Sequence, residues 1–153
     1  MTPRHRAQQE SKGREMQPIP ELRSRLKDLF QKQYFSLVAF SVSDDLRLFL
    51  FSTPRSTRKF RYLSQNPEVS LLVDDRSNEI TDIERVTAVS IAGRAAELAG
   101  GQRIAMLGLH LAKHPSLEKF ARSPNSALVV VTVRRYGIVT SFQSIVMLAP
   151  EEV

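Results

Sequence analysis

The chain has 153 residues, no cysteine and a formal net charge of +6. This length suits a single domain, and 42% hydrophobic with 25% charged residues is the balance of a soluble globular protein without a membrane span. The lack of cysteine excludes disulfides, thiolate nucleophiles and Cys-ligated zinc. Residues 1–6 lead into no apolar signal-peptide segment, so we expect a cytoplasmic location.

Most of the excess positive charge lies near the N-terminus. Residues 1–33 contain 8 basic and 4 acidic residues, whereas the rest of the chain contains 14 and 12. Residues 1–18 are polar and aperiodic, and Glu10 and Glu15 interrupt the basic residues. We therefore predict a disordered basic tail over residues 1–18, in preference to a nucleic-acid-binding arm, and one folded domain over residues 19–153.

The first predicted elements are a helix and a β-hairpin. Pro20 begins a helix with an apolar face, which consists of Leu22, Leu26, Leu29 and Phe30. The period then changes to two residues, which predicts a strand over residues 34–42 and its antiparallel partner over residues 46–52. Residues 43–45 form the turn between them.

A short helix over residues 57–65 follows, and Asn66-Pro67 ends it. A third strand is predicted over residues 69–73. The next segment is polar and contains Asp74, Asp75, Asp82 and Glu84, for which a solvated loop is favoured over an acid/base pair. Apolar and polar residues alternate again over residues 86–98, which predicts a strand. Gly93 within it indicates a bulge or sharp bend.

The last part of the chain predicts helices over residues 101–114 and 116–121 and two final strands over residues 127–134 and 138–148. Tyr136 would pack at the turn between these strands. Strands in a meander, with few helices, favour a small closed or partly closed β-barrel of about six strands at most.

The segment from Thr53 to Lys59 is rich in hydrogen-bond donors. It holds three hydroxyls, two guanidiniums and one ammonium where a strand gives way to a helix N-terminus. Arg binds a phosphate through two parallel hydrogen bonds, and Lys adds a compact charge. The segment predicts a phosphate pocket. The alternative is a solvated turn in which Ser56 or Thr57 caps the helix.

The sequences LFSTPRSTRKFRYL (50–63), NPEVSLLV (66–73) and GRAAEL (93–98), together with His114-Pro115, resemble the pyridoxamine 5'-phosphate oxidase-like family of FMN-binding split barrels. The resemblance covers roughly residues 20–148. It implies that the FMN phosphate is held in the 52–59 segment and that the flavin ring lies along the strand at residues 35–40. The candidate cofactor-binding residues are Phe35, Ser36, Leu37, Val38, Ser52, Thr53, Ser56, Thr57, Arg58 and Lys59. Family members are typically homodimers with FMN at the subunit interface, so the resemblance implies a homodimer as well.

Two departures from the family change the expected activity and fold. Ala88 or a neighbour stands where the pyridoxamine 5'-phosphate oxidases carry a ring-contacting Gln, and their Trp-containing substrate motif has no counterpart. Oxidation of pyridoxamine 5'-phosphate is therefore not expected. A strand of about five to ten residues that relatives place before residue 34 is also missing. The expected fold is a mainly β, six-stranded-type antiparallel split barrel with a few helices, whose first strand is a candidate for loss.

The resemblance implies an FMN-dependent oxidoreductase whose small-molecule substrate is not identified, with a deazaflavin or haem as alternatives to FMN. A non-catalytic flavin carrier or a dimeric barrel without cofactor remains an alternative, and nucleic-acid binding is less favoured. His110 and His114 have the i, i+4 spacing of a metal pair, but the sequence places no third ligand. A helix-end pair that interacts with the helix dipole is the preferred interpretation.

Overall fold

The computed structural model describes residues 18–32, 38–77, 79, 85–141 and 144–153. The predicted tail falls outside these ranges except for its last residue. The helices and strands are α1 (Ile19–Lys32), β1 (Phe40–Val42), β2 (Leu48–Pro54), α2 (Arg58–Gln65), β3 (Glu68–Asp74), β4 (Ala88–Glu97), α4 (Gly100–Lys113), the 3-10 helix η1 (Pro115–Leu117), α5 (Glu118–Arg122), β5 (Ser126–Ser141), β6 (Ser144–Leu148) and the 3-10 helix η2 (Pro150–Glu152).

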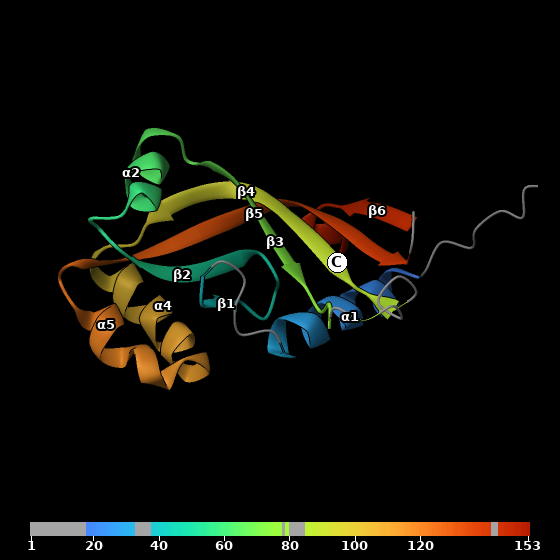
Figure 1. Ribbon diagram of the computed structural model, residues 1–153, viewed down its shortest axis with the longest axis horizontal. Helices are drawn as coiled ribbons and strands as arrows, with labels where there is room; N and C mark the ends of the chain where they lie inside the picture. The colour runs from blue at the N-terminus through green and yellow to red at the C-terminus, as the bar shows by residue number, and fades with distance from the viewer. Residues whose placement is uncertain (1–17, 33–37, 78, 80–84, 142–143) are drawn as a thin grey trace, which may run out of the picture.

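A single antiparallel six-stranded sheet forms the centre of the protein (Figure 1). Its strands follow the order β1-β2-β5-β4-β3, and β6 pairs with β5. Figure 1 shows the long strands β4 and β5 crossing the molecule, with α4 and α5 near one end and α1 near the other. Within the described residues β1 and β3 are edges that do not pair with each other, so the barrel is open between them. The predicted split barrel is confirmed.

The concave side of the sheet holds the larger core, and α1 covers it. The buried apolar face of α1 packs in one cluster with inward-facing side chains of β1, β2, β4 and β5. Phe30 makes edge-on ring contacts with Phe40 and Phe49, at centroid distances of 6.2 and 5.7 Å. Helix α1 therefore covers the edge strand β1 at Phe40.

The opposite side of β2 and β5 is covered by the other helices. Its cluster consists of Leu50, Leu98, Leu107, Ala121, Leu128 and Val130, with Leu107 contributed by α4 and Ala121 by α5. Successive residues of a strand face opposite sides, which places Leu50 in this cluster and Phe51 in the concave one. Among the described residues, no helix is long and apolar enough to cross a membrane.

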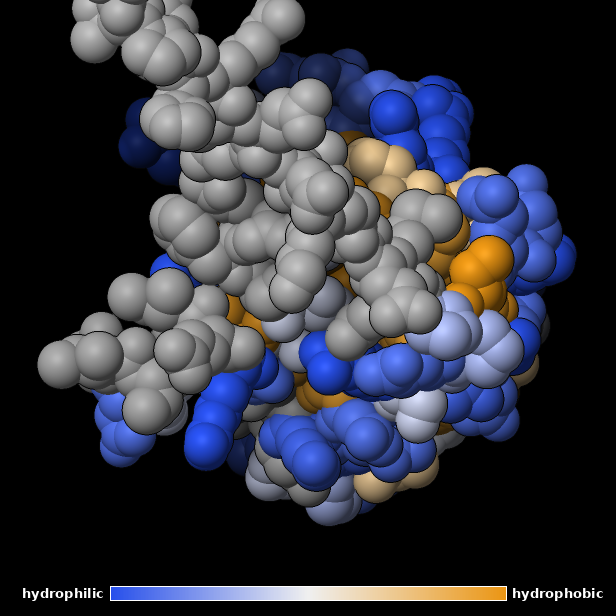
Figure 2. All heavy atoms as spheres, turned by 90° about the vertical axis from the view of Figure 1, so that its right-hand side faces the viewer, coloured by the Kyte–Doolittle hydropathy of each residue, from blue (hydrophilic) through white to orange (hydrophobic). Residues whose placement is uncertain are grey.

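Part of the sheet surface, over β3, β4, β5 and β6, remains exposed. Strand pairing aligns Leu72, Ser90, Gly137 and Met147 in one row across β3, β4, β5 and β6. The exposed fractions of Leu72 and Met147 are 53% and 52%. The side view in Figure 2 shows a mostly hydrophilic surface with hydrophobic residues visible between the polar ones.

The structure has two final strands, β5 and β6, but the predicted turn at Tyr136 is wrong, because β5 continues through this residue to Ser141 and β6 begins at Ser144. Tyr136 is fully buried in β5, and its hydroxyl donates a hydrogen bond to the carbonyl of Leu46. Gly137 does not form a turn; it allows side chains of the neighbouring strands to pack closely against β5. A Cβ on Gly137 would lie 2.5 Å from Ser90 Oγ and 3.1 Å from Met147 Sδ.

The predicted bulge at Gly93 is confirmed by a register shift between Ala92 and Gly93. A Cβ there would come within 2.5 Å of the carbonyl oxygen of Thr132. The first hairpin is shorter than predicted, since β1 begins at Phe40 and Leu46 lies in the turn with a φ of 60°. The described residues contain no strand before β1; residues 33–37, which include the first four residues of the strand predicted over 34–42, lie outside them.

Candidate functional site

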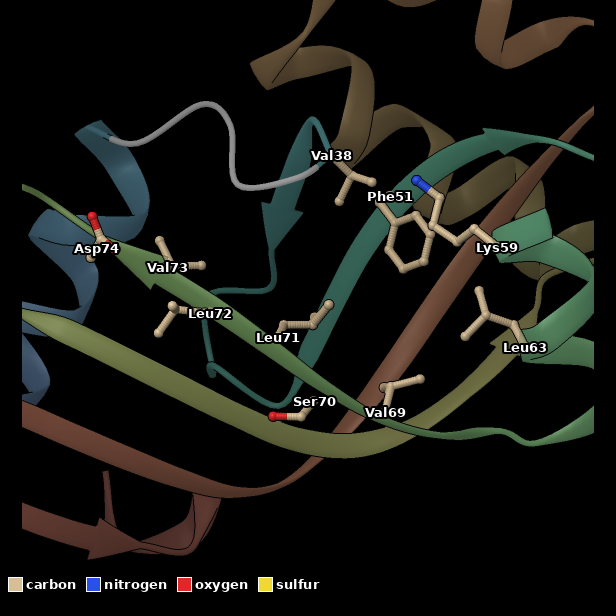
Figure 3. Close-up of a pocket in the computed structure, with 10 residues that line it drawn as sticks. All are labelled: Val38, Phe51, Lys59, Leu63, Val69, Ser70, Leu71, Leu72, Val73 and Asp74. Atoms are coloured by element: carbon tan, nitrogen blue, oxygen red, sulfur yellow. The ribbon is translucent and has the colours of Figure 1, made fainter. Parts of the chain in front are cut away.

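A pocket of about 600 Å³ opens between β2, β3 and α2. Figure 3 shows the residues around it, which come from these three elements and from the segment before β1. They are Val38, Phe51, Lys59, Leu63, Val69, Ser70, Leu71, Leu72, Val73 and Asp74. The walls are mainly apolar and the volume lies in the range of small-molecule and cofactor sites.

Lys59 is the cation of this pocket. Its side chain extends from α2 over Phe51, and its Nζ lies 5.7 Å from the ring centroid (Figure 3). Partial burial lowers the pKa of Lys59. No ion pair joins it to any of the described residues. An anion in the pocket would offset the cost of partly desolvating this ammonium group.

The turn before α2 is held by two threonine hydroxyls. Thr57 Oγ1 accepts a hydrogen bond from the N–H of Phe60 at 3.2 Å and donates to the carbonyl of Pro54 at 2.8 Å. Thr53 Oγ1 lies 3.3 Å from Thr57 Oγ1. Because the Thr57 hydroxyl has a single hydrogen, Thr53 is the donor of this last bond. Thr57 is the N-cap of α2 and is one of the two residues, Ser56 or Thr57, that the alternative interpretation of the segment allows for this role.

The three cations of this segment differ in what they contact. Arg55 forms an ion pair with Glu97, and its Nε donates to the carbonyl of Pro124 at 3.1 Å. Arg58 is exposed and, like Lys59, forms no ion pair with a described residue. Arg55 therefore joins the turn before α2 to Glu97 at the end of β4 and to Pro124 before β5. Arg58 and Lys59 are available to a ligand.

The first backbone N–H groups of α2 are also available. Phe60 and Arg61 donate theirs to Thr57, to its hydroxyl and its carbonyl. Within the described part of the chain, the N–H groups of Arg58 and Lys59 have no such acceptor. Helix N-termini carry positive partial charge, so these two N–H groups and the side chains of Arg58 and Lys59 can attract an anion; of the two side chains, only that of Lys59 lines the pocket.

Ser52 is not part of this arrangement through its side chain. Thr53 faces the concave side of β2 and is buried, whereas Ser52 faces α4. The hydroxyl of Ser52 lies 3.2 Å from His110 Nε2, and Ser41 Oγ lies 3.0 Å from His110 Nδ1. The structure thus separates two neighbouring residues that the sequence placed in one phosphate site.

The two histidines lie between α4 and the first hairpin. His110 is fully buried, and this burial, with the charges of His114 and Lys113, lowers the pKa of His110 to about 4. His114 Nε2 donates to the carbonyl of Phe40 at 2.6 Å. The predicted charge–dipole interaction is wrong for His110, which is neutral near pH 7. The described residues contain no group of three potential metal ligands.

Two of the remaining candidates lie within the described residues. Val38 lies at the pocket wall, and Ser56 is exposed in the turn. Phe35, Ser36 and Leu37 lie outside the described residues. Leu63, Val69 and Leu71 line the pocket but are not among the residues predicted from the sequence. The alternation of β3 was a usable signal, because Val69 and Leu71 share one face of that strand.

The acidic segment contributes structural bonds where it is described. Asp74 pairs with Arg76 at 2.6 Å, and Asp75 accepts a hydrogen bond from the N–H of Thr87 at 2.7 Å. Asp82 and Glu84 lie outside the described residues.

Solved structures with the same fold include proteins that bind cofactors. A haem-binding protein from Mycobacterium smegmatis matches with a TM-score of 0.66 and 17% identity, over 75% of this chain and 46% of that one. General stress protein 26 from Bacillus anthracis str. Sterne matches with a TM-score of 0.63 and 14% identity, over 84% and 98%. An FAD-binding protein from Mesorhizobium loti matches with a TM-score of 0.50 and 15% identity, over 65% and 68%. The chain thus spans less than half of the first protein and nearly all of the second.

No curated protein sequence matches the chain. The family model described as pyridoxamine 5'-phosphate oxidase matches residues 28–140, which is more than half of the chain and includes the pocket and the segment before α2. The chain therefore belongs to the pyridoxamine 5'-phosphate oxidase family.

Proposed function

We propose that the protein binds FMN and acts as an FMN-dependent oxidoreductase on a small molecule. The observation that carries this proposal is an apolar pocket of about 600 Å³ whose cation, Lys59, has no ion pair among the described residues and lies beside the N-terminus of α2. Family membership supports the proposal, as does the fold shared with an FAD-binding protein.

Lys59 at the pocket and its neighbour Arg58 on α2 suit the chemistry of FMN. A phosphate monoester needs charge-assisted donors, which Arg58, Lys59 and their backbone N–H groups can supply. A flat ring needs apolar walls, which Phe51, Val69 and Leu71 provide. When bound, the flavin would supply the transfer of electrons, and the protein would supply grip, orientation and exclusion of water.

The same residues favour FMN over haem. Haem iron is held by His, Cys, Met or Tyr side chains, and none of the described residues around the pocket is of these types. His110 and His114 are already bonded to the first hairpin on the other side of β2.

The central test is a fluorescence titration with FMN and with riboflavin, which lacks the phosphate. We expect FMN to bind more tightly, because the proposed donors Arg58, Lys59 and the first N–H groups of α2 would bind its phosphate. Replacing Arg58 and Lys59 together by Ala should weaken FMN by roughly a hundredfold or more and leave riboflavin unchanged. Arg61→Ala is the matched control, since Arg61 is an exposed cation of the same helix. Equal affinities for the two flavins would contradict the proposal.

The alternative of a non-catalytic flavin carrier needs a separate measurement. We expect NADH or NADPH to reduce FMN in the FMN-saturated protein. The reduction is measured under anaerobic conditions as a loss of flavin absorbance. Tight FMN binding with no reduction by either donor would favour the carrier.

We further propose a homodimer, supported by the exposed row that contains Leu72 and Met147. Sedimentation at micromolar concentration should show twice the chain mass. Met147→Glu should shift the mass toward the monomer, and Ile104→Glu, on exposed α4, should not. A wild-type protein that sediments as a monomer would overturn the dimer.

A further inference from the structure

A second pocket, of about 340 Å³, lies between α1, the β1–β2 turn and α4, away from the proposed flavin site. In Figure 1, α1 and α4 lie below the sheet with the first hairpin between them. The apolar part of its wall comes from all three elements and consists of Phe30, Val42, Leu46, Leu109 and Ala112.

Three hydrogen-bond donors face this pocket from two helices. Lys27 and Gln31 are one turn apart on α1, so they project from the same side of that helix. Their side chains form no hydrogen bond or ion pair with the described residues. Lys113 comes from α4, where its Nζ donates to the carbonyl of Phe30 and lies 4.1 Å from the ring centroid of Phe40.

The charges at the pocket favour an anion. It is bordered by two ammonium groups and one carboxylate, Asp44, which pairs with neither lysine. We propose that this pocket binds a small organic acid, whose carboxylate accepts hydrogen bonds from Lys27, Gln31 and Lys113. The apolar body of the acid contacts the Leu46 and Leu109 wall. This site does not depend on flavin binding.

The ionisation of Lys113 gives the binding a pH dependence. Burial lowers the pKa of Lys113 to about 8, and the ionisable groups around it are Lys27, Asp44, His110 and His114. A bound carboxylate favours the charged ammonium form and raises this pKa. Affinity therefore stays constant below pH 8 and falls as the pH rises above it.

Benzoate and its neutral analogue benzamide are the probes, measured by saturation-transfer NMR and calorimetry at pH 7 and pH 9.5. We expect benzoate to bind and benzamide to bind at least about tenfold more weakly. Lys27→Met and Lys113→Met should each weaken benzoate by about tenfold, and Lys119→Met on exposed α5 should have no effect. Lys59→Met should weaken FMN but leave benzoate unchanged, which separates this site from the flavin site.

Equal binding of the two probes, no binding of benzoate, or unchanged affinity in the Lys27→Met variant would overturn the proposal. Lys113→Met removes a contact to α1, so its fold is checked by circular dichroism. If that variant does not fold, Lys27→Met and Gln31→Leu decide the question, because neither side chain contacts a described residue through a hydrogen bond or ion pair.

Discussion

On one face of β2, Thr53 leads into a turn beyond which Arg58 and Lys59 have no ion-pair partners among the described residues. On the opposite face, Ser52 and Ser41 occupy both ring nitrogens of the fully buried His110. Both clusters are built from residue types common in active sites. They differ in whether their donors and acceptors are already used.

Coverage explains the difference. His110 lies on the buried side of α4, which packs against the serines of β1 and β2 and shields them from water. Buried polar groups are costly unless they form hydrogen bonds within the protein. Lys59 lies at an open pocket, where water or a ligand can satisfy its ammonium group. Available donors at an apolar pocket indicate binding, whereas a satisfied polar cluster indicates structure.

The largest expected effect on stability comes from disrupting the core on the concave side of the sheet. Phe51, which lines the pocket, belongs to this core. Leu26→Asp places a carboxylate at a fully buried position of α1 and should destabilise the protein by more than about 4 kcal/mol. Thermal unfolding followed by circular dichroism measures the change. Arg23→Asp is the control, because Arg23 is exposed on the same helix. A Leu26→Asp variant that melts like the wild type would show that α1 does not cover the barrel.

The next effect tests the satisfied cluster. His110→Leu removes the hydrogen-bond partner of two serine hydroxyls, of which Ser41 is buried, and should cost about 2–3 kcal/mol at pH 7. Chemical denaturation gives the free energy of unfolding. Unchanged stability would mean that the hydroxyls find other partners when the imidazole is absent.

Acid should reduce the difference in unfolding free energy between the wild type and His110→Leu. The pKa of His110 is about 4 in the folded protein and 6.5 when unperturbed, so the unfolded chain binds the proton more tightly. The stability that neutral His110 contributes is complete above pH 6.5 and declines as the pH falls toward 4. The advantage of the wild type over His110→Leu should therefore shrink by about 3 kcal/mol between pH 7 and pH 4. A constant difference over that range would contradict a buried neutral imidazole.

A smaller effect is expected from the buried hydroxyl of the concave face. Tyr136→Phe leaves the carbonyl of Leu46 without its donor, at a turn residue with positive φ, and should cost about 1–2 kcal/mol. Tyr62→Phe should have no measurable effect, since Tyr62 is exposed on α2. Equal melting temperatures for wild type and Tyr136→Phe would show that water replaces the phenol.

The sequence predicted the features that depend on neighbours along the chain. The cap of α2 at Ser56 or Thr57, the end of α2 before Pro67 and the bulge or bend at Gly93 are local patterns, and the structure has a cap at Thr57, a helix end at Gln65 and a register shift at Gly93. The division of donors between the faces of β2 was not predictable in this way. It depends on Glu97 pairing with Arg55 and on His110 reaching Ser52, which are contacts between segments far apart in the chain.

The course of β5 through Tyr136 and Gly137 has the same origin. A Tyr-Gly pair between two apolar runs is a turn signal when only the local sequence is considered. The reason for the glycine is the close approach of Ser90 and Met147 from the neighbouring strands. A single sequence does not contain that information, because it shows neither strand as a neighbour of Gly137.

The smallest effect on stability should come from the residue most important for binding. Lys59→Met keeps an unbranched side chain over Phe51 and removes an ammonium group whose pKa is lowered by partial burial. The free energy of unfolding without ligand should change by no more than about 0.5 kcal/mol, and it can increase. Added FMN, whose stabilising effect grows with the logarithm of its affinity, should raise the melting temperature less than in the wild type. Arg61→Met is the control and should retain the rise. If Lys59→Met instead destabilised the protein by more than about 1 kcal/mol, Lys59 would be a structural residue like Arg55, and the contrast between the two faces of β2 would fail.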